Sequence, residues 1–320
     1  FGGLSNDTYI VNNSSDRVFE TSNARPDSID NVRSSVNFTL AANVEHLVLL
    51  GSAVSGTGNN LDNGIVGNGV NNVLKGLGGN DRLNGGIGAD RMSGGTGSDT
   101  YFIDNRRDQV IEAANQGHDV VFSPLSFTAL SANVEELVLD AGATRGQGNS
   151  LGNFLIGNAR NNVLKGLGGG DRLEGSGGND ILDGGTGNDR LNGVTGNDVL
   201  LAGLGRDVLS GGPGADRFRF VTTADSRPGL AFEDALQDFT RSEGDKIDLV
   251  RIDANTTLAG NQAFVFIGSS ATPGPGELSV FVSGGQTFVR GNTDADAALE
   301  IQFHLRGRST VPDLASDYFL

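Results

Sequence analysis

A nine-residue repeat sets the strongest limit on the fold of this chain. Residues 148–219 divide into eight consecutive nonapeptides without a slip in phase. The sixth position of each is Asn or Asp, and the eighth is Leu in seven repeats and Phe in the last. A second array of five nonapeptides covers residues 58–102. A flexible Gly/Asn-rich linker has no reason to keep acidic and apolar residues in phase, so the repeats indicate a folded solenoid.

A larger duplication contains both arrays. The segment NVEHLVL at 43–49 recurs as NVEELVL at 133–139, a shift that equals ten nonapeptides. The same shift relates residues 71–83 to residues 161–173. A weaker echo links residues 6–20 to 98–112.

The spacing predicts an all-β, parallel β-roll. Each nonapeptide is expected to form a six-residue turn and a three-residue strand, and two nonapeptides form one coil. Glycines at positions 1, 2 and 4 allow positive φ and close backbone approach. The apolar eighth residue is expected to point inward. Residues that are two nonapeptides apart should then stack one strand spacing apart, about 4.8 Å.

This stacking places sixth-position carboxylates above one another, where they repel unless a cation lies between them. Turn carbonyls can supply the remaining oxygens that Ca²⁺ prefers, whereas Mg²⁺ demands a tighter octahedron. Cysteine is absent and the turns contain no histidine, which disfavours zinc and copper. The predicted ligands of several Ca²⁺ ions are Asp81, Asp90, Asp99, Asp171, Asp180, Asp189, Asp198, Asp207 and Asp216, with the fourth-position glycines Gly79, Gly88, Gly97, Gly169, Gly178, Gly187, Gly196, Gly205 and Gly214.

Four turns carry Asn at the sixth position: Asn63, Asn72, Asn153 and Asn162. Asn offers one neutral acceptor oxygen, so these turns are either weak sites or metal-free rungs. One buried Leu in each nonapeptide repays little of the conformational entropy lost on folding. The arrays are therefore expected to stay largely disordered without metal and to fold when they bind it.

The repeat matches GGxGxDxUx, in which U is a large apolar residue. With 50 glycines in 320 residues, the chain resembles the RTX family of type I-secreted bacterial proteins. That resemblance implies a calcium-binding β-roll, a secreted, extracellular or cell-surface location, and the type I secretion apparatus as a partner during export.

Residues 1–57 and 103–147 flank the arrays and show alternating apolar residues, which predict further solenoid strands. Asp16 and Glu20 recur as Asp108 and Glu112. Solvated charge on a strand edge is the favoured interpretation of these residues, and a metal site is the alternative.

Residues 220–320 form the predicted cap of the solenoid. Strand-like runs occupy 263–268, 278–282, 287–291 and 299–305. The region resembles the C-terminal domain of serralysin-type secreted proteases, which implies that the terminal residues Asp317, Tyr318, Phe319 and Leu320 belong to a type I secretion signal. Asp294 and Asp296, with Glu300, suggest either an extra Ca²⁺ loop or a surface acidic turn. Asp238, Asp245 and Asp248 are candidates to close the last solenoid site.

Charge and composition exclude several functions. A net charge of −16 argues against nucleic-acid binding, which needs a basic face. No apolar run approaches the length of a membrane span. The histidines His46, His118 and His304 are scattered and form no HExxH motif, and we expect no GxSxG motif and hence no hydrolase nucleophile elbow. We therefore expect a non-catalytic chain.

The chain begins at Phe1 without Met and inside a repeat-like motif, so we interpret it as part of a longer protein. Two functions fit. The first is a structural or adhesive module of an extracellular or cell-surface protein, with self-association or surface and polysaccharide contacts. The second is an export and folding module of a secreted enzyme, such as a metalloprotease, lipase or alginate epimerase, whose catalytic domain lies upstream.

Overall fold

The structure is a computed structural model that folds as two compact units, residues 1–143 and 144–320. The unit boundary falls inside the predicted segment 103–147, and the five predicted segments themselves stay a prediction. Among the described residues, no helix is long and apolar enough to cross a membrane. The structure describes residues 6–20, 29–229, 233–269, 272–284, 286–296, 298–306 and 318–319.

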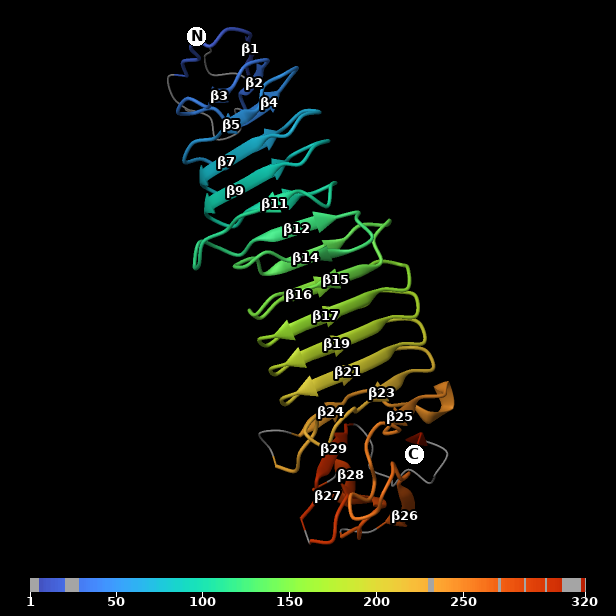
Figure 1. Cartoon of the computed structure of the whole chain (residues 1–320). Coiled ribbons are helices and arrows are strands. Elements are labelled where there is room, and N and C mark those ends of the chain that lie inside the picture. Colours follow the sequence, from blue (N-terminus) through green and yellow to red (C-terminus); the bar gives the residue numbers. More distant parts are fainter. Residues whose placement is uncertain are drawn as a thin grey trace. The chain divides into compact units, whose positions relative to one another are not determined.

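The first unit contains two parallel ladders of short strands (Figure 1). One ladder runs β1-β2-β4-β6-β8-β10-β12-β14 and the other β3-β5-β7-β9-β11. The strands are β1 (Thr8–Val11), β2 (Asn31–Ser34), β3 (Phe38–Thr39), β4 (His46–Leu49), β5 (Ser55–Thr57), β6 (Gly64–Val66), β7 (Val73–Gly78), β8 (Arg82–Asn84), β9 (Arg91–Thr96), β10 (Thr100–Phe102), β11 (Gln109–Val110), β12 (Val120–Ser123), β13 (Thr128–Ala129) and β14 (Glu136–Leu139).

The second unit repeats this plan. One parallel ladder runs β16-β18-β20-β22-β24 and the other β15-β17-β19-β21-β23-β25-β30. The parallel strands are β15 (Arg145–Gln147), β16 (Phe154–Ile156), β17 (Val163–Gly168), β18 (Arg172–Glu174), β19 (Ile181–Thr186), β20 (Arg190–Asn192), β21 (Val199–Leu204), β22 (Val208–Ser210), β23 (Arg217–Arg219), β24 (Asp234–Leu236), β25 (Lys246–Asp248) and β30 (Tyr318–Phe319).

The pairing register confirms the predicted coil of two nonapeptides. Leu173 pairs with Leu155 on one side and Leu191 on the other, and Leu182 pairs with Leu164 and Leu200. Every eighth-position side chain of both arrays is at most 1% exposed, from Ile65 to Phe218. The eighth residues therefore form continuous apolar stacks that are the core of each unit.

The two ladders differ in strand length, which the repeat did not predict. Within the arrays, β6, β8, β10, β16, β18, β20 and β22 have three residues, as expected, but β7, β9, β17, β19 and β21 have six. Pairing resumes beyond the first-position glycine, because Lys165 pairs with Asp183 and Leu167 then pairs with Gly185. Leu167 and Gly185 occupy this position in their strands and have φ of 83° and 100°. A single residue in the left-handed region lets the longer strand continue past the turn glycine.

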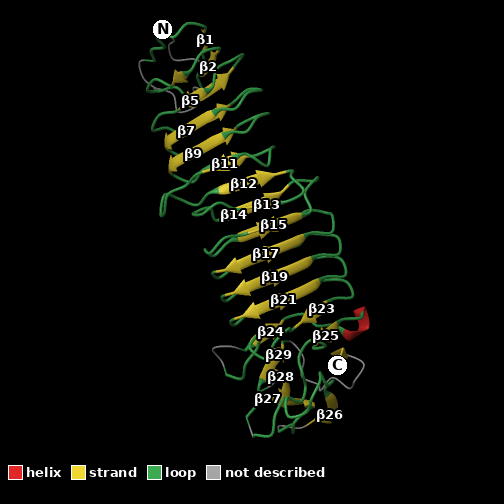
Figure 2. Ribbon diagram, viewed as in Figure 1, coloured by secondary structure: helices red, strands yellow, loops and turns green. Residues whose placement is uncertain are grey.

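The C-terminal region caps the second unit. β24 and β25 extend the two parallel ladders, and β29 pairs with β24 (Figure 2). A three-stranded antiparallel meander of β27, β28 and β29 follows, which confirms the strand-like runs expected there. Of the predicted secretion signal, Asp317 and Leu320 lie outside the described residues, whereas Tyr318 and Phe319 form β30. The remaining elements are β26 (Val265–Ser269), β27 (Glu277–Ser283), β28 (Gln286–Asn292), β29 (Ile301–Leu305) and the 3₁₀ turn η1 (Arg241–Glu243).

Candidate metal centre

The sixth-position aspartates form vertical stacks along the turn edges, as the repeat predicts. One carboxylate oxygen, Oδ1, of each residue accepts the backbone N–H of the sixth-position residue one coil earlier. The N–H of Asp171 donates to Asp189 at 2.7 Å, and the N–H of Asp189 donates to Asp207 at 2.7 Å. The stack of Asp180 and Asp198 has the same geometry. Each bond fixes the orientation of a carboxylate within its turn.

The second carboxylate oxygen, Oδ2, of these residues is buried and has no hydrogen-bond partner within the described structure. The side chains are at most 2% exposed. Burying a charged oxygen without a partner is costly, so a whole row of them indicates a missing positive partner. The unpartnered oxygens belong to Asp81, Asp90, Asp99, Asp171, Asp180, Asp189, Asp198, Asp207 and Asp216.

The surroundings of these oxygens fit a hard cation. A Cβ built on Gly76 would stand 1.9 Å from Oδ2 of Asp81 and 2.6 Å from the carbonyl oxygen of Gly94, one coil further on. The same holds at Gly166, whose Cβ would meet Oδ2 of Asp171 at 2.1 Å and the carbonyl oxygen of Gly184 at 2.5 Å. Two oxygens converge over the Cα atoms of these residues, which explains why glycine occupies the first position of every repeat except the one that begins at Ala202. An all-oxygen donor set of this kind is what Ca²⁺ prefers.

The carboxylates resist ionisation when no metal is present. Burial and, to a smaller extent, the neighbouring carboxylate one coil away raise the pKa of Asp180 and Asp189 to about 7, although the backbone N–H bond opposes both effects. Asp81 and Asp216 also have a pKa of about 7 for the same reasons. A bound divalent cation would restore the ionised form by neutralising the paired charges.

The fourth-position glycines provide the positive φ and close backbone approach that the repeat predicts. Gly169 and Gly187 have φ of 109° and 140°. The carbonyl oxygen of Gly169 lies 1.4 Å from the point where a Cβ on Gly187 would stand. These glycines therefore allow successive turns to pack backbone against backbone. A metal-ligand role for their carbonyls stays a prediction, whereas the first-position carbonyls beside Oδ2 were missed.

In the asparagine turns, both the oxygen and the nitrogen of the side-chain amide have hydrogen-bond partners, as Asn63 and Asn72 show. The side-chain oxygen of Asn63 accepts the N–H of Asn59 at 2.7 Å, and its Nδ2 donates to the carbonyl of Val44 at 3.2 Å. Asn72 accepts from Asn68 at 2.8 Å and donates to Ala53 at 3.0 Å. Of the two alternatives, this geometry favours metal-free rungs, because the amide supplies the donor that a carboxylate lacks.

Acidic residues outside the nonapeptides continue the stacks, and two of them were missed by the repeat analysis. Asp207 donates its N–H to Oδ1 of Asp234 at 2.7 Å, and Asp99 donates to Asp119 at 2.8 Å. Oδ2 of Asp234 is also buried without a partner, and burial raises its pKa to about 9. A residual D-x-U pattern, as in Asp234-Ala235-Leu236, is the signal that could have identified them.

The three acidic candidates at the end of the second array have separate roles. Asp245 continues the stack, since it accepts the N–H of Asp216 at 2.9 Å. Asp238 instead accepts the N–H of Gly212 at 2.8 Å, and Asp248 pairs with Arg219 at 2.8 Å. Asp248 is therefore neutralised by an arginine.

The three acidic residues of the cap loop lie close together in the structure. Carboxylate oxygens of Asp294, Asp296 and Glu300 lie within 4.8 Å of one another. Asp294 accepts the N–H of Asp296 at 2.9 Å, and Glu300 accepts the N–H of Thr293 at 2.7 Å. Asp296 is exposed. Both the Ca²⁺ loop and the surface acidic turn stay open.

The interpretation of Glu112 as solvated charge is wrong. Its side chain is 8% exposed, and burial raises its pKa to about 7. Asp108 is half-buried and accepts the N–H groups of Asp90, Asp104 and Asn105. Both acids belong to the edge of the solenoid, where the turn backbone or a neighbouring carboxylate contacts them.

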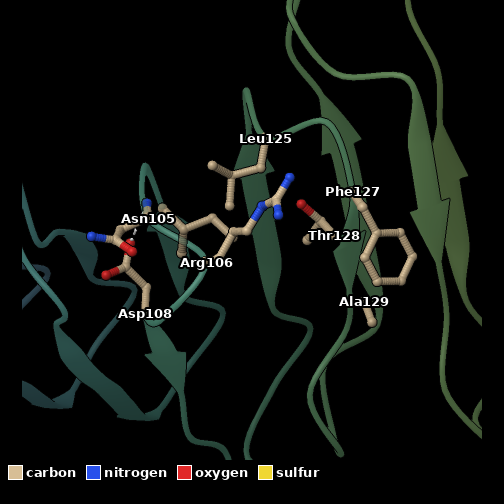
Figure 3. Close-up of a pocket in the computed structure, with 8 residues that line it drawn as sticks. Asn105, Arg106, Asp108, Leu125, Phe127, Thr128 and Ala129 are labelled. Carbon is tan, nitrogen blue, oxygen red and sulfur yellow. Dashed lines mark hydrogen bonds between the residues drawn. The ribbon is translucent and has the colours of Figure 1, made fainter.

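One surface pocket of the first unit is lined by Arg106, Asp108 and several apolar residues. The pocket, of about 330 Å³, lies beside β11 and β13, where Arg106 points between Leu125 and Thr128 (Figure 3). Arg106 donates to Ser126 at 3.0 Å. Contrary to expectation, residues 148–152 match the spacing G-x-S-x-G. They form a turn between β15 and β16 with no helix after it, so Ser150 does not stand on a nucleophile elbow.

Comparison with known proteins identifies the repeats. A family model described as the RTX calcium-binding nonapeptide repeat matches residues 66–101, 147–182, 156–191 and 183–218. No curated protein matches the chain. Two solved subunits of the Azotobacter vinelandii mannuronan C5-epimerase are similar to it. The AlgE6R3 subunit is 28% identical over 53% of this chain and 79% of its own, with a TM-score of 0.35. The AlgE6R2 subunit is 27% identical over 55% of this chain and 91% of its own, also with a TM-score of 0.35.

The resemblance of residues 220–320 to serralysin-type proteins stays a prediction. The family match and the stacked aspartates agree in position, since both cover the turns of the two arrays. Residues 66–101 and 147–218 are therefore RTX calcium-binding nonapeptide repeats, and their cofactor is Ca²⁺.

Proposed function

We propose that this chain is a secreted module that folds when Ca²⁺ fills the turns of its two arrays, after export through a type I secretion apparatus. The observation that supports it most strongly is the row of nine buried aspartate oxygens without partners. A chain that buries so many acidic groups without neutralising them would be poorly stable, so the cation is proposed to be part of the folded state.

The ligands proposed for each ion are Oδ2 of a sixth-position aspartate and the carbonyl of the first-position glycine one coil further on. At the centre of the second array these are Asp180 with Gly193 and Asp198 with Gly211. The bound ion supplies charge neutralisation only. The chain's own residues fix the carboxylate through its backbone hydrogen bond and exclude side chains from the space above the glycine.

Such a module fits the passage of an unfolded chain through an export channel. In low calcium the carboxylates repel and the arrays stay open, whereas millimolar calcium outside the cell fills the sites. We place the protein outside the cell or on its surface on this reasoning.

We favour a structural or adhesive role in a larger extracellular protein, because the duplication of ten nonapeptides extends the solenoid by repetition. The alternative is an export and folding module of a secreted enzyme, which the serralysin-like sequence of residues 220–320 favours. Light scattering with and without millimolar Ca²⁺ separates the two. Calcium-dependent assembly supports the structural role, and a strictly monomeric chain counts against it.

Far-ultraviolet circular dichroism of the chain in chelator, followed by Ca²⁺ titration, tests the proposal. We expect a largely unfolded spectrum that converts to a strand spectrum as Ca²⁺ rises to millimolar concentration. The same concentration of Mg²⁺ should be much less effective, because the ion demands a smaller octahedral site. A strand spectrum that is unchanged by chelator would refute the proposal.

A further inference from the structure

Two glutamates stand where the regular coils have a small residue. Thirteen positions after the sixth-position aspartate, the arrays carry glycine at Gly94, Gly184, Gly193 and Gly211, or alanine at Ala202. The corresponding residue after Asp99 is Glu112, and the corresponding residue after Asp7 is Glu20. A side chain therefore enters the space that is open above the turn in a regular coil.

The coil is enlarged at both places. Thr100 on β10 pairs with Val120 on β12, whereas a coil of two nonapeptides would bring it opposite His118. Thr8 on β1 pairs with Asn31 on β2, and this coil is longer still. The additional residues give the chain room to direct a glutamate back over the aspartate of the preceding turn.

The glutamate completes a group of three carboxylates. Oxygens of Asp99, Glu112 and Asp119 lie within 4.8 Å of one another. The three side chains are 0%, 8% and 1% exposed. Oδ2 of Asp99 and Oε2 of Glu112 have no hydrogen-bond partner in the described structure. Two carboxylate oxygens of this close group are therefore buried without a partner.

Hydrogen bonds hold the other oxygens of this group in place. Oδ1 of Asp119 accepts the N–H of Asp99 at 2.8 Å. Oε1 of Glu112 accepts the hydroxyl of Tyr101 and the N–H of Gly94, the latter at 3.2 Å. The N–H of Asp119 in turn donates to Glu135 at 2.9 Å. In the folded unit the carboxylates are therefore held in place by the chain's own hydrogen bonds, which favours binding of a cation there.

A second group in the same unit has the same contacts. Oxygens of Asp7, Glu20 and Asp30 also lie within 4.8 Å of one another. Asp7 donates its N–H to Asp30 at 2.8 Å, and the hydroxyl of Tyr9 donates to Glu20. Asp30 donates its N–H to Glu45 at 2.8 Å. Three matching contacts in two separate places indicate a repeated motif with a common purpose.

We propose that Asp99, Glu112 and Asp119, and likewise Asp7, Glu20 and Asp30, form a second type of cation site for a hard ion of the size of Ca²⁺. Each site has three carboxylates in place of a carboxylate and turn carbonyls. Affinity for Ca²⁺ rises with the number of charged ligands, so these sites fill at lower Ca²⁺ than the array sites. Of the ligands proposed here, only Asp99 also belongs to an array site. The proposal therefore depends on Glu20 and Glu112.

The tyrosines provide a selective readout. The chain contains no tryptophan and three tyrosines, Tyr9, Tyr101 and Tyr318. Terbium replaces calcium at oxygen sites and emits when a nearby tyrosine is excited. In a full-length Tyr318→Phe background, tyrosine-sensitised emission therefore reports on the two proposed sites, because Tyr9 and Tyr101 contact their glutamates.

We expect emission that appears at lower Tb³⁺ than the folding transition and that excess Ca²⁺ competes away. Glu112→Gln and Glu20→Gln should each weaken the corresponding component by about tenfold or more, because one charged ligand is lost. Glu112→Gly restores the glycine of a regular turn, so it should fold while losing the tight component. Glu136→Gln is the matched control, since Glu136 pairs with the exposed His118.

Circular dichroism in excess Ca²⁺ verifies that each variant is folded. Emission from Glu112→Gly and Glu20→Gln that equals that of Glu136→Gln would overturn the proposal. Absence of tyrosine-sensitised emission in a chain that folds with Ca²⁺ would also overturn it while leaving the proposed function intact. Emission in a chain whose circular dichroism ignores Ca²⁺ would support these sites and refute the proposed function.

Discussion

Replacing Asp189 with Asn should change stability in opposite directions with and without calcium. Asp189 lies between Asp171 and Asp207 in the middle of the second array. An Asn side chain keeps the oxygen that accepts the N–H of Asp171 and removes the charge from the unpartnered position. The metal-free fold therefore loses repulsion, and the calcium-loaded fold loses a ligand.

The spacing of the coils sets the magnitude of both effects. At about 4.8 Å and an effective dielectric near 20, two ionised carboxylates repel by about 3 kcal/mol, so Asp189→Asn relieves up to that amount for each neighbour. Burial raises the pKa of Asp189 to about 7, so this relief is largest above that pH. A site filled at 100 times its Kd contributes about 2.7 kcal/mol, which the variant loses in calcium.

At pH 8, urea unfolding in excess Ca²⁺ followed by circular dichroism measures the loss of the ligand, and the residual strand content in chelator measures the relief of repulsion. The midpoint of the Ca²⁺ titration should also move upward by about tenfold or more, since about 1.4 kcal/mol corresponds to tenfold. Asp183→Asn is the control, because Asp183 forms a surface pair with Lys165 at 3.5 Å that contributes little. A loss of stability in calcium no larger than that of the control would refute the proposed ligand.

Protonation, backbone strain and core packing can each be tested separately. In chelator, strand content should increase as the pH falls from about 7 towards 4. The folded-state pKa of Asp81, Asp180, Asp189 and Asp216 is raised to about 7, so the metal-free fold binds protons that the unfolded chain releases. In calcium the pH dependence should reverse, and parallel curves would contradict the reasoning. Val194→Gly should stabilise the calcium-loaded chain by about 1 kcal/mol in thermal unfolding. Val194 has φ of 79°, in the left-handed region that strains a residue with a side chain. A destabilised variant would show that the valine side chain compensates for this strain. Leu191→Ala should cost about 2–5 kcal/mol in urea unfolding, because it leaves a cavity between Leu173 and Leu209; a neutral result would exclude the continuous apolar stack.

The repeat predicted the fold because its two constraints are local. A glycine at a turn and an apolar residue every nine positions specify where the chain bends and which side is buried, without knowledge of distant segments. The stacks of Leu173 on Leu191 and of Asp171 on Asp189 follow from that periodicity alone. The strand-like runs of the cap were recognisable for a similar reason, since β-branched and aromatic residues occur between turn residues there.

The oxygens proposed to bind the cation in each turn were harder to predict from the sequence. The repeat identified the aspartates. It placed carbonyl ligands at the fourth-position glycines, which stays a prediction, and it could not single out the first position because both positions carry glycine. In the structure the first-position glycine lies beside the free oxygen, as the contact between Gly76 and Asp81 shows. Sequence gives the spacing of residues along a coil, but the direction of each carbonyl depends on φ and ψ.

The amino-acid sequence by itself determined the coil of two nonapeptides, the buried apolar stacks and the rows of aspartates, since each depends on a fixed separation along the chain. Only the tertiary structure decided which additional acids join those rows. Asp234 lies over Asp207, and Glu112 lies beside Asp119, across insertions that break the nine-residue period. Where the period ends, proximity is set by how the longer loops pack on the preceding coil, and packing is not encoded in sequence spacing.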